Sequence, residues 1–311
     1  MSEPLPDEVR RLLDIRADAR TAGDFDRADQ LRDQLADLGW QVQDGPAGST
    51  ARPALPASPV RTGYARAEDL ASLLDEPPIV DASLQLVAED HPDDLARCLR
   101  GLSDHAQSGS WELVLVANGP TFDLDAVLVG APLPTPAIVL PTSARLGWAD
   151  AHNLGLRRSR GAVTVLLDTS LEPTGDVIGP LLRAFEDPSV GIAGGWGVTS
   201  GTGRQFVDAP PGEVDAVEGY CLAIRREALR AVEAFDHRYR FYRNADLDFS
   251  FAVRAAAWRA IRTEPLPLLR HEHRAFASLP PEERDRLSKR NFYRFLKRWG
   301  DRRDLLLRPD A

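Results

Sequence analysis

Three acidic residues and two histidines stand at positions where a reactive site can form. Asp168 directly follows the apolar run VTVLL, and Asp246 and Asp248 open an apparent helix. His271 and His273 come after a strand-like run further along the chain. A carboxylate and an imidazole can hold a divalent cation, and a second carboxylate can take a proton from a hydroxyl group. These residue types are therefore able to support cation binding or proton transfer.

Each of these residues also has a purely structural interpretation. Asp168 is followed by Thr169 and Ser170, residue types that begin turns and cap helices. Negative charge is stabilising at a helix N-terminus, and side chains at i and i+2 point to different faces of a helix. Asp246 and Asp248 therefore cannot both enter one pocket as equals, and we favour capping for Asp248. A histidine at a strand end can equally be a surface hydrogen-bonding residue.

Alternating strands and helices from Ile79 onward predict the framework that positions these residues. Apolar runs alternate with amphipathic segments through the rest of the chain, which is the pattern of an α/β layer fold. In open α/β sheets, ligands bind beyond the carboxyl ends of the strands, and Asp168 falls at such an end. We assign residues 79–311 to this domain.

The chain before this domain divides into two zones. Residues 5–39 predict two helices around a turn at Gly23, and the second helix has an apolar stripe at helical spacing: Ala28, Leu31, Leu35 and Leu38. From Pro46 to Gly63, four prolines with Gly, Ser and Ala predict a linker without a packed core. The predicted boundaries are a helical hairpin over residues 1–45 and a Pro-rich linker over residues 46–78.

Composition is typical of a soluble globular protein. The 311 residues are 43% hydrophobic and 27% charged, and the net charge of −9 gives no reason to expect nucleic acid as the main partner. Cys98 and Cys221 lie far apart without metal-ligand spacing, so we expect a reducing cytoplasm. No apolar run has the length of a membrane span, and the N-terminus lacks a signal-peptide pattern. We therefore expect a cytoplasmic protein, with at most peripheral membrane contact.

Six sequence blocks resemble, in order, those of family 2 glycosyltransferases of the GT-A fold. The resemblance covers roughly residues 80–300, and the blocks read VLVANGP, ARLGWADAHNLGLRRSRG, LLDTS, EGYCLAIRREAL, FDHRYRFY and ADLDF. The resemblance implies an α/β fold with a GT-A-like mixed sheet flanked by helices. It also implies inverting transfer of a sugar from a nucleotide-diphospho-sugar donor to a hydroxyl acceptor, which we expect to be a glycan or a lipid-linked molecule.

The resemblance assigns roles to the polar residues of these blocks. Asp246 is implied to be the general base, and Asp168 with His271 is implied to hold a divalent cation, Mn²⁺ or Mg²⁺. A further set is implied to bind the donor or the acceptor: Glu89, Asp90, Asn118, Arg145, Gly147, Asn153 and Asp248.

Three positions depart from the family pattern. Ala117 stands where the family often has the aspartate that contacts the nucleotide base. Ser170 replaces the second acid of D-x-D, and Ala245 replaces the glutamate of E-D. Because Mg²⁺ and Mn²⁺ prefer charged oxygen ligands, we expect the cation to bind weakly. The alternative function is a catalytically degenerate transferase that acts as a nucleotide-binding, glycan-binding or protein-interaction module.

The N-terminal segment GDFDRADQLRDQLADLGWQVQDGPAGS resembles the C-terminal element of cysteinyl-tRNA synthetases. Residues 1–45 contain eleven acids and six arginines, a local charge of −5, and binding to phosphates needs the opposite sign. We therefore expect a structural or protein-contact role for this segment, and no nucleic-acid partner.

The C-terminal segment RDRLSKRNFYRFLKRWGDRR predicts a basic amphipathic helix. Between Arg284 and Arg308 the chain has eight arginines and two lysines. We favour a helix that docks on the domain and keeps a solvated basic face. The alternative is peripheral contact with the inner face of a membrane through this helix.

Overall fold

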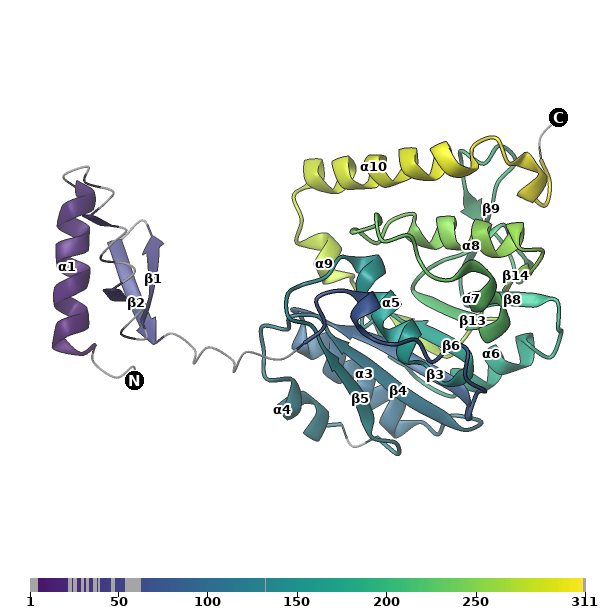
Figure 1. Cartoon of the computed structure of the whole chain (residues 1–311), viewed down its shortest axis with the longest axis horizontal. Coiled ribbons are helices and arrows are strands. Elements are labelled where there is room, and N and C mark those ends of the chain that lie inside the picture. Colours follow the sequence, from purple (N-terminus) through teal and green to yellow (C-terminus); the bar gives the residue numbers. More distant parts are fainter. Residues whose placement is uncertain are drawn as a thin grey trace. The chain divides into compact units, whose positions relative to one another are not determined.

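The computed structural model divides the chain into two compact units, Met1–Arg61 and Thr62–Ala311 (Figure 1). Each unit has an apolar core of its own. The structure describes residues 5–21, 24, 27–28, 31, 34–35, 38, 40–45, 48–53, 63–131 and 133–309.

The first unit packs a helix against a β-hairpin. Helix α1 spans Asp7–Thr21, and strands β1 (Trp40–Gly45) and β2 (Gly48–Pro53) pair antiparallel. The core between them contains Leu12 and Leu35 among other apolar side chains. The hairpin therefore completes a core that a single helix could not bury.

The predicted second helix of this unit lies partly outside the described residues. Within its apolar stripe, Ala28, Leu31 and Leu35 are helical and buried, as expected. Leu38 is instead in a turn and is 45% exposed. The stripe therefore ends before Leu38, because the chain turns there toward β1.

Two parts of the predicted linker over residues 46–78 are structured instead. Strand β2 lies inside that range, because backbone pairing with β1 does not depend on the small and proline-rich side chains of the segment. Further on, Tyr64 forms a bridge to Thr142, and Ala67 is buried in the 3₁₀ helix η1 (Ala67–Asp69) against the second unit's core. Residues 54–62 of the predicted linker lie outside the described residues.

The second unit is built on a mixed sheet with the strand order β11-β14-β8-β13-β6-β3-β4-β5. Its strands are β3 (Val80–Ala88), β4 (Trp111–Ala117), β5 (Ala137–Pro141), β6 (Gly161–Leu167), β8 (Val190–Gly194), β11 (Gly212–Glu213), β13 (Cys221–Arg225) and β14 (Arg259–Arg262). Strands β6, β3, β4 and β5 run parallel, and β13 lies antiparallel between β6 and β8. The predicted α/β class with a mixed sheet is confirmed.

Helices cover both faces of this sheet (Figure 1). One face carries α3 (Pro92–Asp104), α4 (Leu124–Val129) and α6 (Ile178–Ala184). The other face carries α5 (Trp148–Arg158), α7 (Arg226–Val232) and α8 (Ala245–Ala255). Successive side chains along each strand point to opposite faces of the sheet, and apolar side chains cover both faces.

Helix α10 (Pro281–Trp299) forms an outer layer over α8 (Figure 1). Phe295 and Trp299 of α10 pack against Phe251 of α8. The remaining elements are β7 (Leu171–Pro173), β9 (Gly197–Thr199), β10 (Val207–Asp208), β12 (Ala216–Val217), β15 (Leu268–Arg270), α9 (Arg274–Ala277) and η2 (Arg303–Leu305). Among the described residues, none of the helices has the length and apolar character needed to span a membrane.

Three parallel strands end side by side on polar residues. Strand β3 leads into Glu89 and Asp90, β4 into Asn118, and β6 into Asp168. Because carboxyl ends of parallel strands meet at one edge of a sheet, these side chains converge on the same edge. The fold thus brings together residues separated by 79 positions in the chain, from Glu89 to Asp168.

Candidate functional site

A cavity of about 440 Å³ lies at the carboxyl edge of the sheet, and we call it the sheet-edge cavity. Its lining includes Glu89, Asp90, Arg145, Asp168 and His273. Four of these five residues were predicted to belong to a ligand site. The cavity has the size of a small-molecule pocket.

Polar side chains on one wall of the sheet-edge cavity bond to one another. Arg145 makes a two-pronged contact with the Asp90 carboxylate at 2.5 and 2.6 Å, and these bonds hold the pKa of Asp90 below its usual value. Asn118 donates from Nδ2 to Glu89 Oε1 at 2.7 Å and accepts from the Leu146 amide at 2.7 Å. Burial raises the pKa of Glu89 against the opposing effect of the Asn118 bond.

Asp168 pairs with His273 on the other wall. Their Oδ2 and Nε2 atoms are 3.3 Å apart, and the Ser170 amide donates to Asp168 Oδ1 at 2.8 Å. Burial opposes ionisation of Asp168, but the bonds from His273 and Ser170 outweigh it and lower the pKa of Asp168. Burial likewise disfavours the charged imidazole, yet Asp168 outweighs it and raises the pKa of His273. The pair is therefore an ion pair while His273 is protonated.

His271 lies elsewhere, contrary to its predicted place beside Asp168. Its Nε2 atom is 2.6 Å from Glu172 Oε2. His271 follows β15, which pairs antiparallel with β7, so the histidine is carried toward Glu172 of that strand. His273, two residues on, turns back to the strand end that carries Asp168. The cation-binding role predicted for His271 thus moves, as a hypothesis, to His273.

A second cavity of about 300 Å³ contains Asp246, and we call it the Asp246 cavity. Asp246 lies at the N-terminus of α8, where the Gly219 amide donates to its Oδ2 at 2.9 Å and the Leu247 amide to its Oδ1 at 2.9 Å. Burial raises the pKa of Asp246 in spite of these bonds. The two cavities share four lining residues: Trp148, Asp168, Tyr242 and His273.

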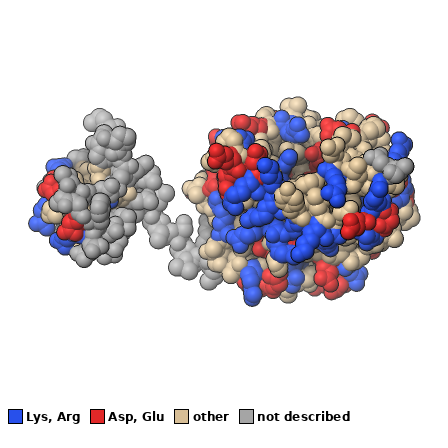
Figure 2. Space-filling model, turned by 90° about the horizontal axis from the view of Figure 1, so that it is seen from above, with Lys and Arg blue, Asp and Glu red and all other residues tan. Residues whose placement is uncertain are grey.

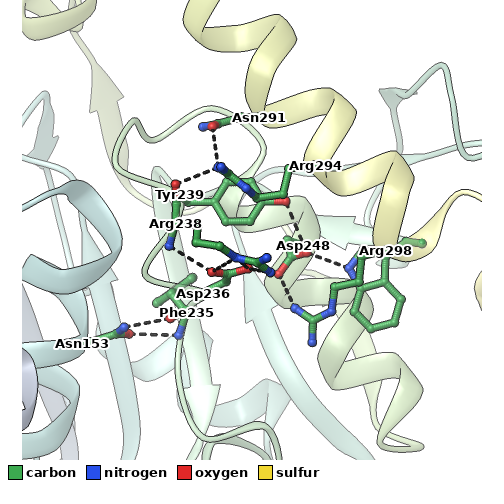
Figure 3. Close-up of polar contacts among 10 residues, drawn as sticks. Asn153, Phe235, Asp236, Arg238, Tyr239, Asp248, Asn291, Arg294 and Arg298 are labelled. Carbon is green, nitrogen blue, oxygen red and sulfur yellow. Dashed lines mark hydrogen bonds and ion pairs between the residues drawn. The ribbon is translucent and has the colours of Figure 1, made fainter.

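Asp248 faces away from both cavities. It is 3% exposed and accepts hydrogen bonds from Trp299 Nε1 at 2.8 Å and Arg298 at 2.8 Å, with the Tyr239 hydroxyl at 3.3 Å (Figure 3). Asp248 therefore joins α8 to α10. This placement agrees with the expected divergence of positions i and i+2 on a helix, and it takes Asp248 out of the predicted substrate-binding set.

Asn153 and Gly147 also pack within the fold and line neither cavity. The Asn153 amide donates to the Phe235 carbonyl at 2.8 Å and accepts from the Phe235 amide at 2.9 Å (Figure 3). Gly147 begins α5 where a Cβ atom would lie 2.9 Å from the Arg240 Cα atom. The substrate contacts predicted for these two residues are replaced by contacts that hold α5 against residues 235–240.

Asp168, His273 and Ser170 carry oxygen and nitrogen atoms of the kinds that bind divalent cations. Among the described residues, no group of three or more His, Cys, Asp or Glu side chains is arranged to hold a metal ion. Ser170 Oγ is buried and has no hydrogen-bond partner within that part of the chain. Mg²⁺ sites commonly combine one or two protein carboxylates with substrate phosphate oxygens. Asp168 supplies one such carboxylate, His273 adds a nitrogen ligand that suits Mn²⁺ better than Mg²⁺, and a bound diphosphate would have to complete the site.

Comparison with known proteins identifies the family of this domain. The family model described as "Glycosyl transferase family 2" matches residues 88–266, which is more than half of the chain. The chain belongs to glycosyl transferase family 2. The fold of this family 2 member is similar to that of GalNAc-T7, solved with UDP, GalNAc and Mn²⁺, with a TM-score of 0.55 and 15% identity over 78% of this chain and 55% of that one. The predicted family resemblance is confirmed.

The N-terminal unit of this family 2 member matches a different family. Residues 2–52 match the "Cysteinyl-tRNA ligase anticodon binding domain" model. The cysteine–tRNA ligase of Bifidobacterium longum is 55% identical over 42 residues, which are 14% of this chain and 8% of the ligase. That of Halobacterium salinarum is 48% identical over 46 residues, 15% of this chain and 9% of the ligase. This chain therefore spans less than a tenth of those ligases, and the second predicted resemblance is also confirmed.

Tyr242 and Glu218 are among the cavity residues that were not predicted from the sequence. Tyr242 stacks on the His273 ring, with centroids 4.7 Å apart and planes 19° apart. It belongs to the block FDHRYRFY, so its place in a matched block was the available signal. Glu218 lines the Asp246 cavity and opens the block EGYCLAIRREAL, where nothing in its immediate neighbours distinguishes it from a surface glutamate.

Proposed function

We propose that this family 2 member transfers a sugar from a nucleotide-diphospho-sugar to a hydroxyl acceptor, with inversion at the sugar carbon. One observation carries the proposal: the two cavities meet at Asp168, His273, Tyr242 and Trp148. A donor in the sheet-edge cavity and an acceptor in the Asp246 cavity would then react across these shared residues. GalNAc-T7, whose fold is similar, is known with UDP and Mn²⁺, which supports the donor class.

The proposed reaction is a single displacement. Asp246 takes the proton of the acceptor hydroxyl as its oxygen attacks the anomeric carbon, and the bond from that carbon to the phosphate oxygen breaks. The nucleoside diphosphate leaves with the bonding electron pair. The raised pKa of Asp246 supports the base role, because a base is more effective when its pKa approaches the working pH. Attack opposite the leaving group gives inversion.

A divalent cation, Mn²⁺ or Mg²⁺, would neutralise negative charge on the diphosphate when it is bound. Asp168 and His273 are the residues proposed to hold it. Since imidazole suits Mn²⁺ better than Mg²⁺, we favour Mn²⁺. Weak binding remains the expectation, because Ser170 offers a neutral oxygen where the family often has an acid.

Substitution of Asp246 by Asn tests this proposal. We expect release of nucleoside diphosphate from the donor to fall roughly 10²–10⁴-fold, because the amide cannot accept the proton. Donor binding, measured by thermal shift, should persist. Glu264→Gln is the control, since it also removes one carboxylate charge but lies on the exposed surface outside both cavities. Undiminished turnover in the Asp246 variant would refute the base assignment.

The degenerate module is the alternative, and one observation favours it. Asp90 and Arg145 are paired with each other, and Glu89 and Asn118 are likewise bonded together. A donor would have to exchange these contacts for its own. Under this alternative, the wild-type protein would bind a nucleotide or glycan without releasing nucleoside diphosphate, so the turnover assay separates the two functions.

The acceptor could be membrane-borne, because α10 presents a basic face to solvent. Lys and Arg side chains gather on the side of the unit seen from above α10 (Figure 2). Exposed members of this face on α10 are Arg286, Lys289, Arg290 and Lys297, together with Tyr293 at 69% exposure. Their spacing of three and four residues puts them on one side of the helix. We propose that this basic face contacts anionic lipid headgroups, while a cytoplasmic location stays a prediction.

A further inference from the structure

Glu218 is held against the proposed base. It directly follows β12, and its amide donates to the Trp196 carbonyl at 3.0 Å. The next residue, Gly219, donates its amide to Asp246 Oδ2. Both carboxylates line the Asp246 cavity, and the charge of Asp246 contributes to raising the pKa of Glu218 after the larger effect of burial. The backbone of this segment therefore fixes Glu218 near the reacting position.

The Glu218 carboxylate is attracted by the more distant charges of Arg270 and Arg243, but it has no bonded partner among the described residues. Across the part of the chain that the structure describes, it makes no hydrogen bond and no ion pair, whereas Asp246 receives two backbone hydrogen bonds. The side chain is half-buried. A carboxylate withdrawn from water without a hydrogen-bond donor is unfavourable, so this position is best satisfied when a ligand supplies the donor. An ionised carboxylate only accepts hydrogen bonds, which means that the ligand must donate.

The rest of the Asp246 cavity limits the class of that ligand. The interior carries the carboxylates of Glu218 and Asp246, neither of which forms an ion pair within the described residues, and they disfavour a phosphate or carboxylate group beside the reacting hydroxyl. Tyr220 and Tyr242 line the cavity, and both rings are fixed: Trp196 and the Arg270 guanidinium contact Tyr220, and His273 stacks on Tyr242. The arginines of the lining, Arg204 and Arg243, are exposed at the rim. Aromatic faces with hydrogen-bond acceptors suit a neutral molecule that has both C–H surface and hydroxyl groups.

We propose that Glu218 binds the acceptor, and that the reacting part of the acceptor is a neutral carbohydrate. One sugar hydroxyl gives its proton to Asp246, and a second hydroxyl of the same sugar donates a hydrogen bond to Glu218. Glu218 selects and orients the acceptor and takes no part in binding the donor. This inference rests on the proposed function and adds the acceptor class to it.

The test compares Glu218→Gln with wild type and with Glu264→Gln as the surface control. Two rates are measured with the same donor and Mn²⁺: hydrolysis of the donor with water as acceptor, and transfer to a panel of neutral methyl glycosides. We expect Glu218→Gln to raise KM for the best glycoside roughly ten-fold or more, since a hydrogen bond to a charged group is lost. Donor hydrolysis should fall much less than transfer, and the control should alter neither rate.

Monodeoxy glycosides sharpen this test. The analogue that lacks the hydroxyl bound by Glu218 should be a poor acceptor for wild type, and Glu218→Gln should cause little further loss with it, because the interaction is already absent. An unchanged KM in Glu218→Gln would overturn the inference, as would an equal loss of hydrolysis and transfer. So would a wild-type protein that hydrolyses the donor yet uses none of the neutral glycosides. Absence of both hydrolysis and transfer in wild type would instead overturn the proposed function.

Discussion

Asp168 and His273 are the polar link between the two cavities. Their side chains are 24% and 19% exposed, so each is withdrawn from water yet still reachable from the cavities. Since Asp168 raises the pKa of His273, a proton and a cation compete for the same imidazole. The His273 imidazole should therefore bind a proton at low pH and be free to bind a cation at higher pH.

At the residue scale, the two histidines should behave differently. His273→Ala should lower the affinity for Mn²⁺ roughly 10-fold, because one of the two protein ligands is lost. The affinity is read from the Mn²⁺-dependent stabilisation by a nucleotide-diphospho-sugar. His271→Ala should leave that affinity unchanged, since His271 contacts Glu172 instead. Thermal-shift titrations with Mn²⁺ at fixed donor measure both variants. The reverse ranking would restore His271 as the ligand.

The pH dependence of stability has a definite sign for this pair. The raised pKa of His273 means that its ion pair stabilises the fold fully below the unfolded histidine pKa of about 6.5 and is lost as pH rises through the higher folded value. The lowered pKa of Asp168 means that its contribution is lost only in acid, as pH falls through the folded value. In urea unfolding without metal, His273→Gln should therefore destabilise the protein more at pH 6 than at pH 9. An equal loss at both pH values would argue against the ion pair.

The sequence could predict Asp168 and Asp246 but not their companions, for a physical reason. A carboxylate after a buried strand or at a helix start is visible in a local pattern, because the element itself sets its position. Which of His271 and His273 returns to Asp168 depends on the turn after β15, about 100 residues from Asp168 in the chain. Glu218 acquires its place only when β12 and α8 pack together. Such contacts between distant segments leave no periodic signal.

At the element scale, the packing of α8 against α10 determines the contacts of Asp248. Asp248 receives donors from Trp299 and Arg298 of α10, while Asn291 of that helix donates to the carbonyls of Phe241 and Arg243. The local sequence pattern predicted that both aspartates lie at a helix start and that α10 is amphipathic. The docking partner was not predictable, because it is set by a tryptophan 51 residues further along the chain. Likewise, the β1–β2 hairpin was hidden by a glycine- and proline-rich composition that is also typical of linkers.

Loss of Asp248 should loosen this joint. Asp248→Ala leaves the buried Trp299 Nε1 and the Arg298 guanidinium without their acceptor, so we expect the free energy of unfolding to fall by about 1–3 kcal/mol. Asp285→Ala on the exposed face of α10 is the control and should change stability by less than about 0.5 kcal/mol. Urea unfolding of the two variants gives the comparison. Equal, small effects would show that the Asp248 contacts contribute no net stability.

At the scale of the whole molecule, charge is unevenly distributed. The chain has a net charge of −9, yet Lys and Arg side chains cluster on the face over α10 (Figure 2). When an acidic protein with one basic surface approaches an anionic partner, it turns that surface toward the partner, because the rest of the protein is repelled. The N-terminal unit, by contrast, is acidic in its first 45 residues.

Binding to lipid vesicles tests the basic face. Vesicles with anionic headgroups should bind the wild-type protein, whereas neutral vesicles should not. The double change Lys289→Gln and Arg290→Gln should weaken binding by about 2 kcal/mol, or roughly 30-fold, at about 1 kcal/mol per cation. Arg100→Gln with Arg230→Gln removes the same charge from exposed positions away from α10 and is the control. Equal losses in both variants would attribute binding to total charge and not to α10.

The central claim is that Asp168 belongs to a cation-dependent site for a nucleotide-diphospho-sugar. The most direct measurement is a thermal-shift titration of the full chain with a panel of such donors, with and without Mn²⁺, in wild type and Asp168→Ala. A donor present at about 100 times its Kd should stabilise the wild-type fold by roughly 2.7 kcal/mol. We predict that one donor class gives this shift, that the shift requires Mn²⁺, and that Asp168→Ala abolishes it. A shift that persists in Asp168→Ala, or no shift with any donor, would contradict the account.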